Sequence, residues 1–290
     1  MNAVYRRELK ANLFSMTGTI FIVFALVFIG IFCADYTFAG ASAHLEYAIY
    51  SVSFFSLLAV PVLTMRTFSE ERQTKVDQLL YSLPLTTSEI VLGKFFALAT
   101  IMAIPTAVTC IFPLVTASLC TAGTINFALI YATILCYYLL GCAVIAICMF
   151  LSSLTESQVI SAVISLAAVL LLYYMSYFAS VVSSSAAVSL VVVLAIAIAV
   201  AYVVWVSLKN YIIAGVVGGV LVVGTAVTYV LKSSLFEGLI GKMFSALAIF
   251  DPIANFANGI FDISTIIYYI SFTALFIFFA IQCVEKRRWN

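Results

Sequence analysis

Charged residues are scarce in this sequence. Asp, Glu, Lys and Arg make up 9% of the 290 residues, against about 25% in an ordinary soluble domain. None of the four occurs between Ala97 and Thr155. A charge-free stretch of that length is tolerated only in lipid or in a very deeply buried chain. With 65% hydrophobic residues and a mean hydropathy of +1.22, the composition predicts a polytopic membrane protein.

Motifs that would give the chain its own chemistry are missing. A Walker A loop needs GxxxxGK followed by Ser or Thr, and neither Gly93-Lys94-Phe95 nor Gly241-Lys242-Met243 has that frame. The single histidine, His44, has no neighbouring ligand cluster, and the seven cysteines never form CxxC. We therefore expect neither enzymatic activity nor a metal or other cofactor in this chain. The spans also lack the carboxylates of a proton relay, so any uphill transport must draw its energy from elsewhere.

The cysteines lie almost entirely inside apolar runs, so we expect them to be small core residues. A disulfide between Cys33 and Cys120 is the alternative, because both positions fall near the predicted outer face.

Apolar windows of about 20 residues predict eight membrane spans. Their ranges are 17–35, 47–65, 93–118, 126–151, 158–181, 186–207, 211–231 and 264–284. With both termini cytoplasmic, eleven of the 13 Lys and Arg residues lie inside, and only Lys232 and Lys242 lie outside. This bias supports that orientation. The fold class is thus an all-α transmembrane bundle forming a single domain over residues 1–290. If 186–207 and 211–231 do not cross separately, six spans leave the termini on the same side.

The stretch 66–94 carries eight of the charged side chains and is predicted to be a water-exposed connector between spans. Ser69 is suited to begin a helix, with Glu70 and Glu71 in its first turn. Apolar side chains at i, i+3, i+4 and i+7 then predict an amphipathic helix that ends at Pro84. These are Val76, Leu79, Leu80 and Leu83. Thr86 and Glu89 fit a capping box, which predicts a second helix starting near Thr87.

The amphipathic helix has two interpretations. It lies among lipid headgroups, or it docks in a groove of a soluble partner. The acidic residues of the connector favour docking, because an anionic leaflet repels them. They are Glu70, Glu71, Asp77 and Glu89.

Three further segments flank the spans. Residues 1–15 predict a basic amphipathic helix on the inner surface. A cleaved signal peptide is the alternative, although the apolar run Gly18–Ala34 is longer than a usual signal core. Residues 233–262 predict short helices at the outer interface, with a turn at Asp251-Pro252. The C-terminal Glu285–Asn290 carries basic residues and Trp289, which suit an inner headgroup anchor.

Several motifs together resemble the permeases of ABC-2 type transporters, and most closely those associated with gliding motility. They are Phe68-Ser69-Glu70-Glu71-Arg72, Leu79-Leu80-Tyr81-Ser82-Leu83-Pro84, Glu89-Ile90-Val91-Leu92-Gly93-Lys94-Phe95, the loop Ser152–Gln158, and Glu285-Lys286-Arg287-Arg288-Trp289. The resemblance covers residues 1–180 and 245–290. Because the usual family body has six spans, residues 185–232 look like an insertion of two more.

The resemblance implies a cytoplasmic coupling helix within 66–94 that docks on a separate ATPase subunit holding ATP and Mg. It also implies a second permease chain, identical or not, in a bacterial plasma membrane, and allows an additional membrane protein with an extracytoplasmic domain. The expected coupling residues are Glu70, Glu71, Arg72, Asp77, Leu79, Leu80, Leu83, Thr155 and Glu156.

The leading hypothesis is therefore the permease subunit of an ATP-driven exporter. Two alternatives remain: a carrier driven by an ion gradient, and a non-transporting scaffold that passes force from an ATPase to an extracytoplasmic partner. A substrate path would be lined by side chains such as Tyr137, Tyr138, Tyr173, Tyr174 and Tyr177, although tyrosines in membrane helices also simply pack. Their apolar character favours a hydrophobic or amphipathic cargo.

Overall fold

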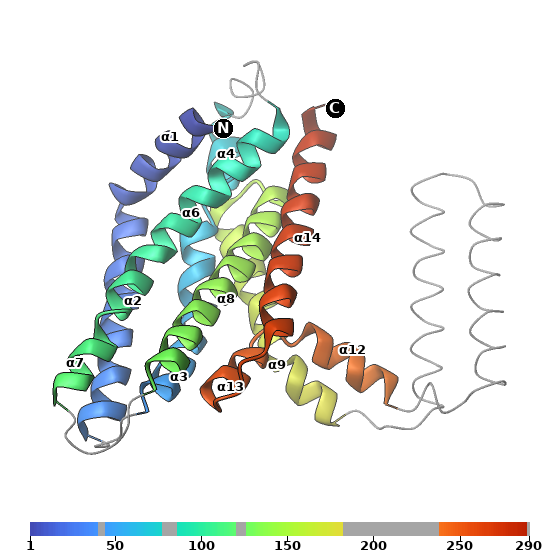
Figure 1. Cartoon of the computed structure of the whole chain (residues 1–290). Coiled ribbons are helices and arrows are strands. Elements are labelled where there is room, and N and C mark those ends of the chain that lie inside the picture. The colour runs from blue at the N-terminus through green and yellow to red at the C-terminus, as the bar shows by residue number, and fades with distance from the viewer. Residues whose placement is uncertain (40–43, 77–85, 120–125, 182–237, 289–290) are drawn as a thin grey trace, which may run out of the picture. The chain divides into compact units, whose positions relative to one another are not determined.

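The computed structural model describes residues 1–39, 44–76, 86–119, 126–181 and 238–288 (Figure 1). Within these ranges every regular element is helical. The chain divides into two compact units, the first made of Met1–Leu171 and Ile249–Asn290 and the second of Leu172–Ala248. Most of the predicted site falls in the first unit.

Ten of the helical elements in the described residues lie wholly in the first unit, and α9 begins there. They are α1 (Asn2–Leu13), α2 (Met16–Cys33), the π-helical η1 (Ala34–Ala39), α3 (Leu45–Thr64), α4 (Ser69–Gln73), α6 (Thr87–Thr109), α7 (Phe112–Leu119), α8 (Phe127–Leu154), α13 (Pro252–Ala257) and α14 (Ile263–Arg288). Helix α9 (Gln158–Val181) runs on into the second unit, which also contains α12 (Leu239–Leu247).

Six helical stretches in the described part of the chain are long and apolar enough to cross a membrane. Their ranges are Met16–Thr37, Leu45–Gln73, Thr87–Ser118, Phe127–Leu154, Gln158–Val181 and Ile263–Arg287. Each matches one of the predicted spans. The remaining two predictions, 186–207 and 211–231, lie outside the described residues, so the count of eight stays a prediction.

Helix α8 occupies the centre of the first unit. It packs against α3, α6, α13 and α14, and small residues allow these backbones to come close. Ala143 and Ala146 are fully buried, and a side chain added at Gly141 would collide with the thioether of Met102 on α6. Cys136, Cys142 and Cys148 are also buried on α8, as predicted for small core residues. Cys33 is buried too, while Cys120 lies outside the described residues.

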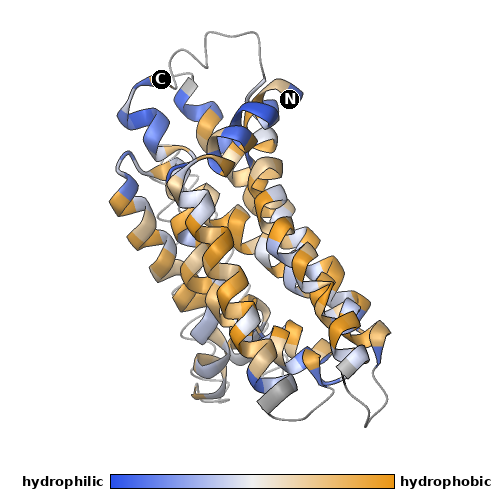
Figure 2. Cartoon of the chain, turned by 90° about the vertical axis from the view of Figure 1, so that its left-hand side faces the viewer, coloured by the Kyte–Doolittle hydropathy of each residue, from blue (hydrophilic) through white to orange (hydrophobic). Residues whose placement is uncertain are grey.

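The described ends of the first unit differ in polarity. Both chain termini, α1, α4 and the start of α6 lie together at one end (Figure 1). Hydrophilic residues gather at this end, whereas the middle of the helices is mostly apolar (Figure 2). We call this end, formed by residues 1–15, 65–76, 86–94, 154–158 and 284–288, the polar end. The termini thus share one end, and which face of the membrane that end meets stays a prediction.

The turn from α1 into α2 shows how the sequence folds at the polar end. Ser15 begins α2, because its Oγ accepts a hydrogen bond from the Gly18 backbone N–H at 3.2 Å. Gly18 itself leaves no room for a larger residue, since an added Cβ would overlap the Asn12 carbonyl oxygen. The predicted N-terminal helix is therefore present, and it bends directly into the first span.

Two prolines in the third span act differently. Helix α6 continues past Pro105 and ends at Thr109, where a short turn at Cys110 and Ile111 divides the span. Pro113 lies at the second position of α7, where its missing N–H leaves no helical hydrogen bond unmade. Pro113 thus lies in the first turn of a new helix and does not bend a continuous one.

The described part of the second unit confirms one predicted short helix. Helix α12 carries the expected apolar face over Leu239–Leu247, and its Gly241 lies against the Ala179 carbonyl near the end of α9. In the first unit, Asp251 precedes α13, as predicted for the turn at Asp251-Pro252.

Candidate functional site

The connector begins without the predicted serine cap. Phe68 precedes the first residue of α4, and the Ser69 hydroxyl donates back to the Met65 carbonyl. The prediction that Ser69 caps a helix was therefore wrong. The chain stays nearly helical from α3 through Met65 to Phe68, so the Ser69 hydroxyl finds a carbonyl one turn behind it.

Helix α4 is also shorter than predicted. It ends at Gln73, and Lys75 has a φ of 57°, a left-handed conformation that interrupts a helix. The Lys75 N–H donates to the Arg72 carbonyl at 3.1 Å, which closes the turn. The helix that the sequence predicts from Ser69 to Pro84 is therefore interrupted at Lys75, and its apolar residues Leu79, Leu80 and Leu83 lie outside the described residues. The prediction of a single amphipathic helix ending at Pro84 missed this break.

The second predicted helix start is confirmed. Thr86 and Glu89 form a capping box, in which each side chain accepts from the backbone N–H of the other residue at 3.3 Å. Helix α6 begins at Thr87, as the sequence predicts.

A buried lysine joins three segments at the polar end. The Lys94 side chain on α6 is only 1% exposed, and its Nζ lies 3.2 Å from Glu8 Oε1 of α1 and 2.9 Å from Glu71 Oε1 of α4. Nζ also donates to the Thr67 carbonyl at 3.0 Å. The residues Lys94, Glu8, Glu71 and Arg7, whose contacts follow, form what we call the lysine cluster.

Charge balance makes burial of the cluster tolerable. Arg7 Nη2 lies 2.7 Å from Glu71 Oε1 and 3.1 Å from Glu8 Oε1, so two cations face two carboxylates. The Phe68 ring adds a further contact, with Lys94 Nζ 5.3 Å from its centroid. Burying charges is costly unless they are paired and hydrogen-bonded. Here the pairing fixes α1 and α4 against the first turns of α6.

Gly93 provides the close approach that this cluster needs. A Cβ at Gly93 would lie 3.1 Å from Val4 Cβ on α1, and Val4 is itself buried. Helix α1 therefore packs directly on the α6 backbone. This contact places Glu8, one turn after Val4, beside Lys94.

The connector is also joined to the end of α8. Arg72, 8% exposed, donates from Nη1 to the Thr155 carbonyl at 3.2 Å. The Phe68 backbone N–H donates to Ser152 Oγ at 3.3 Å. These two hydrogen bonds join α4 and its preceding residue to the end of α8, the central helix of the unit.

The last helix meets the same loop from another side. Arg287 Nη1 of α14 lies 3.3 Å from Glu156 Oε1, and its Nη2 donates to the Leu154 carbonyl at 3.4 Å. The two charged side chains are 38% and 78% exposed. This pair lies at the surface, and Glu156 remains accessible to a partner.

A polar cavity of about 280 Å³ lies beside the lysine cluster. It is lined by Arg7, Glu8, Ala11, Asn12, Ser15, Thr17, Arg66, Thr67, Glu70, Glu71, Thr74, Val76 and Lys94. Arg66 and Glu70, four residues apart, form a second ion pair in its wall, with Nε 2.9 Å from Oε2. The cavity walls therefore carry equal numbers of positive and negative charges.

The structure places five of the predicted coupling residues at the polar end. Glu70 pairs with Arg66, Glu71 belongs to the lysine cluster, and Arg72 contacts Thr155. Glu156 pairs with Arg287. The other four, Asp77, Leu79, Leu80 and Leu83, lie outside the described residues.

The tyrosines proposed for a substrate path do not gather in one place within the first unit. Tyr137 is 4% exposed inside the bundle, and Tyr138 donates to the Ala99 carbonyl at 3.4 Å. Tyr173, Tyr174 and Tyr177 belong to the second unit, where the last two are 46% and 64% exposed. Their role in a path stays a prediction.

Comparison with known protein families adds to this geometry. Residues 9–214 match the model of the ABC-2 family transporter proteins, well over half of the chain. The chain belongs to the ABC-2 transporter family. No curated protein matches it. The family match includes α4, α6, α8 and α9, and therefore most of the polar end of this ABC-2 protein. The family match ends at residue 214, inside the segment 185–232 that looks like an insertion. Membership of the gliding-motility subgroup stays a prediction.

Sequence reasoning missed the partnership of Glu8 with Lys94. The two residues are 86 positions apart, and nothing local pairs them. One signal was available: Lys94 follows Gly93 at the start of a long apolar run, where a lysine needs a carboxylate partner.

Proposed function

We propose that the chain is the membrane-spanning permease subunit of an ATP-driven ABC-2 exporter in a bacterial plasma membrane. A separate ATPase subunit, which holds ATP and Mg, docks on the polar end from the cytoplasm. A second permease chain completes the assembly. The cargo is hydrophobic or amphipathic. Family membership and the arrangement of the polar end support this proposal.

The supporting observation is the set of contacts that ties the connector to three transmembrane helices. The lysine cluster joins α4 to α6, and the Arg72 contact with Thr155 joins it to the end of α8. The loop after α8 contains both Thr155 and Glu156, and it is joined to α14 by the pair between Glu156 and Arg287. A force applied to the connector is therefore distributed to several spans at once.

Exposure separates two roles among the coupling residues. Glu70 and Glu156 have side chains that are 40% and 78% exposed, so an ATPase can contact them. Glu71 and Arg72 are largely covered by their own chain, and they pass the movement inward. In the proposed cycle, closure of the ATPase on ATP moves the exposed residues, and the buried ones tilt α6 and α8.

Charge reversal of the exposed residues tests this docking. The variants are Glu70→Lys and Glu156→Lys, purified from membranes that contain the natural partners. Asp35→Lys is the matched control, because Asp35 is exposed in η1, away from the polar end. The readouts are co-purification of an ATPase that contains a Walker A loop, and the rate of ATP hydrolysis by the complex.

The native chain and Asp35→Lys are expected to retain the ATPase. Each reversal at the polar end should weaken its binding by about tenfold, as for the loss of about 1.4 kcal/mol. Failure of any Walker A ATPase to co-purify with the native chain would overturn the proposal. Equal losses in Asp35→Lys and Glu156→Lys would overturn the docking site. ATP-dependent solute movement in liposomes then separates a transporter from a scaffold.

A further inference from the structure

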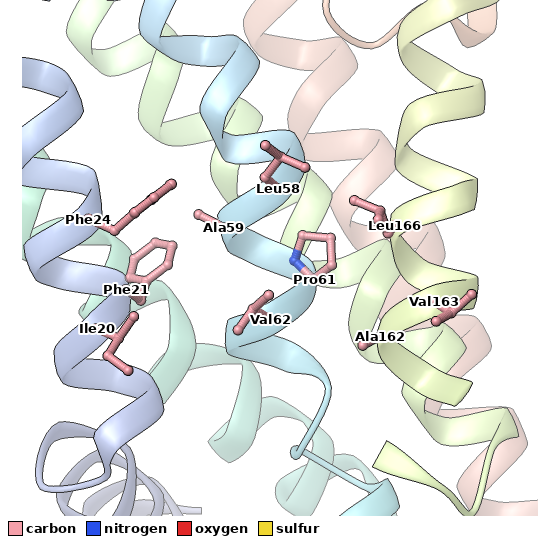
Figure 3. Close-up of a pocket in the computed structure, with 10 residues that line it drawn as sticks. All are labelled: Ile20, Phe21, Phe24, Leu58, Ala59, Pro61, Val62, Ala162, Val163 and Leu166. Atoms are coloured by element: carbon pink, nitrogen blue, oxygen red, sulfur yellow. The ribbon is translucent and has the colours of Figure 1, made fainter. Parts of the chain in front are cut away.

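An apolar groove lies between α2, α3 and α9 in the first unit. Its volume is about 350 Å³, and Figure 3 shows its lining side chains on the three helices. They are Ile20, Phe21 and Phe24 of α2, Leu58, Ala59, Pro61 and Val62 of α3, and Ala162, Val163 and Leu166 of α9. Ile20, Val62 and Val163 are 48%, 43% and 60% exposed, so the groove opens at the surface of the chain.

The groove and the polar cavity lie along the same helix faces. On α2, Thr17 of the cavity is followed by Ile20, Phe21 and Phe24 of the groove. This spacing of i, i+3, i+4 and i+7 puts them on one side of the helix. Beside it, Ala59 and Val62 of the groove lead to Arg66 of the cavity with a spacing of i, i+3 and i+7.

The junction between them is short. From Thr17 to Ile20 the rise along a helix is about 4.5 Å, and from Val62 to Arg66 it is about 6 Å. An amphipathic molecule can therefore place its charged head in the cavity while an apolar chain enters the groove.

The charges of the cavity decide which head group fits. Arg7, Arg66 and Lys94 are balanced by Glu8, Glu70 and Glu71. A lipid site that selects an anionic head group is basic, whereas this one is neutral with both signs present. Arg66 and Glu70 pair with each other through two contacts of 2.9 Å, and their side chains are 34% and 40% exposed. The pair therefore presents a cation and a carboxylate, side by side, to a ligand that carries both charges.

We infer that this site binds one zwitterionic phospholipid with a primary ammonium head group, of the phosphatidylethanolamine type. Its phosphate is bound by the Arg66 guanidinium, and its ammonium by the Glu70 carboxylate. One acyl chain lies in the groove against Phe21, Val62 and Ala162. The lipid connects α2, α3 and α9 near the connector. This inference goes beyond the proposed function and does not depend on an ATPase.

Native mass spectrometry of the isolated chain tests the site. The protein is reconstituted in nanodiscs that contain equal amounts of phosphatidylethanolamine and phosphatidylglycerol, and is then released with its retained lipids. Ala162→Phe fills the groove, and Arg66→Gln removes the phosphate ligand. Their matched controls are Ala167→Phe, exposed on α9 outside the groove, and Arg6→Gln, exposed on α1 outside the cavity.

The native chain should retain one phosphatidylethanolamine in preference to phosphatidylglycerol. Arg66→Gln should reduce this retention by about tenfold, the scale of one hydrogen bond to a charged group. Ala162→Phe should reduce it comparably, and both controls should retain the lipid. Val163→Phe is a second groove variant, in case Ala162→Phe does not fold.

Three results would overturn the inference. Equal retention of the two lipids would indicate ordinary lipid at the protein surface. Unchanged retention in both folded groove variants would mean that the groove holds no acyl chain. A native dimer without lipid that Ala162→Phe converts to a monomer would assign the groove to a second copy of the chain.

Discussion

The connector and the loop after α8 meet at the same polar end, but they are held there in different ways. The connector is fixed by Lys94, 1% exposed, with carboxylates that are 11% and 14% exposed. The loop is held to α14 by Arg287 and Glu156, which are 38% and 78% exposed. Buried pairs are costly to break, whereas exposed pairs contribute little. The difference indicates that the connector is held rigidly, whereas the contact between the loop and α14 is easily exchanged.

Removing the buried cation should have the largest effect. Lys94→Met leaves Glu8 and Glu71 facing Arg7 alone, and we expect a loss of about 3 kcal/mol in the free energy of unfolding. The measurement is denaturant unfolding of the purified protein in detergent. Lys10→Met, exposed on α1, is the matched control and should stay within about 0.5 kcal/mol of the native chain. Adding Glu8→Gln to Lys94→Met should restore part of the loss, and equal stability of the two lysine variants would contradict the comparison.

The close contact between Gly93 and Val4, which brings α1 to the lysine cluster, should give the second largest effect on stability. Gly93→Val forces a side chain against Val4, whose Cβ lies 3.1 Å from the position of an added Cβ. Overpacking of this kind costs about 2 kcal/mol. Gly30→Val in α2 is the control, since an added Cβ there meets nothing within 4 Å. A second change, Val4→Ala, should relieve the strain, and its failure to do so would mean that α1 does not pack on α6 as described.

How much of this was predictable depends on whether a feature is local. The length of an apolar run is a property of neighbouring residues, so the six described spans and the Thr86–Glu89 cap were predicted correctly. Burial is not local. Helices α8 and α9 are similarly apolar. Yet 72% of an 18-residue apolar segment of α8 is buried within the chain, against only 17% of the corresponding segment of α9. Hydropathy alone does not reveal which helix forms the centre.

The candidate site likewise has local features that were predictable and non-local ones that were not. The polar end was predictable because its charges interrupt the apolar pattern, and five expected coupling residues do lie there. The side-chain cap by Ser69 was wrong, and so was the continuity of its helix past Lys75, because tertiary contacts of Phe68 and Arg72 hold α4 as a short helix. The part from Leu79 to Leu83 lies outside the described residues. Ion pairs between residues as distant as Glu8 and Lys94 require the fold.

Arg72 connects the two regions of the comparison and should give an intermediate effect. Arg72→Met removes the charged hydrogen bond to the Thr155 carbonyl, which contributes about 1.5 kcal/mol. Hydrogen exchange should then accelerate in peptides from both 68–76 and 152–157, because the two keep the Phe68–Ser152 hydrogen bond but lose the one from Arg72 to Thr155. Arg6→Met, exposed on α1, should leave both unchanged. Faster exchange in only one of the two peptides would show that they are not joined through Arg72.

The exposed pair should give the smallest effect. Arg287→Gln removes the charge that faces Glu156 across 3.3 Å, but a solvent-exposed pair contributes at most about 1 kcal/mol and often nothing measurable. We expect the free energy of unfolding to change by no more than about 0.5 kcal/mol. High salt, which screens exposed pairs, should change the free energy of unfolding of the native chain equally little. A loss as large as that of Arg72→Met would show that the loop is anchored as firmly as the connector. Glu156 would then not be free to leave Arg287 and bind a residue of the proposed ATPase, and the proposed contact with that partner would have to lie elsewhere on the polar end.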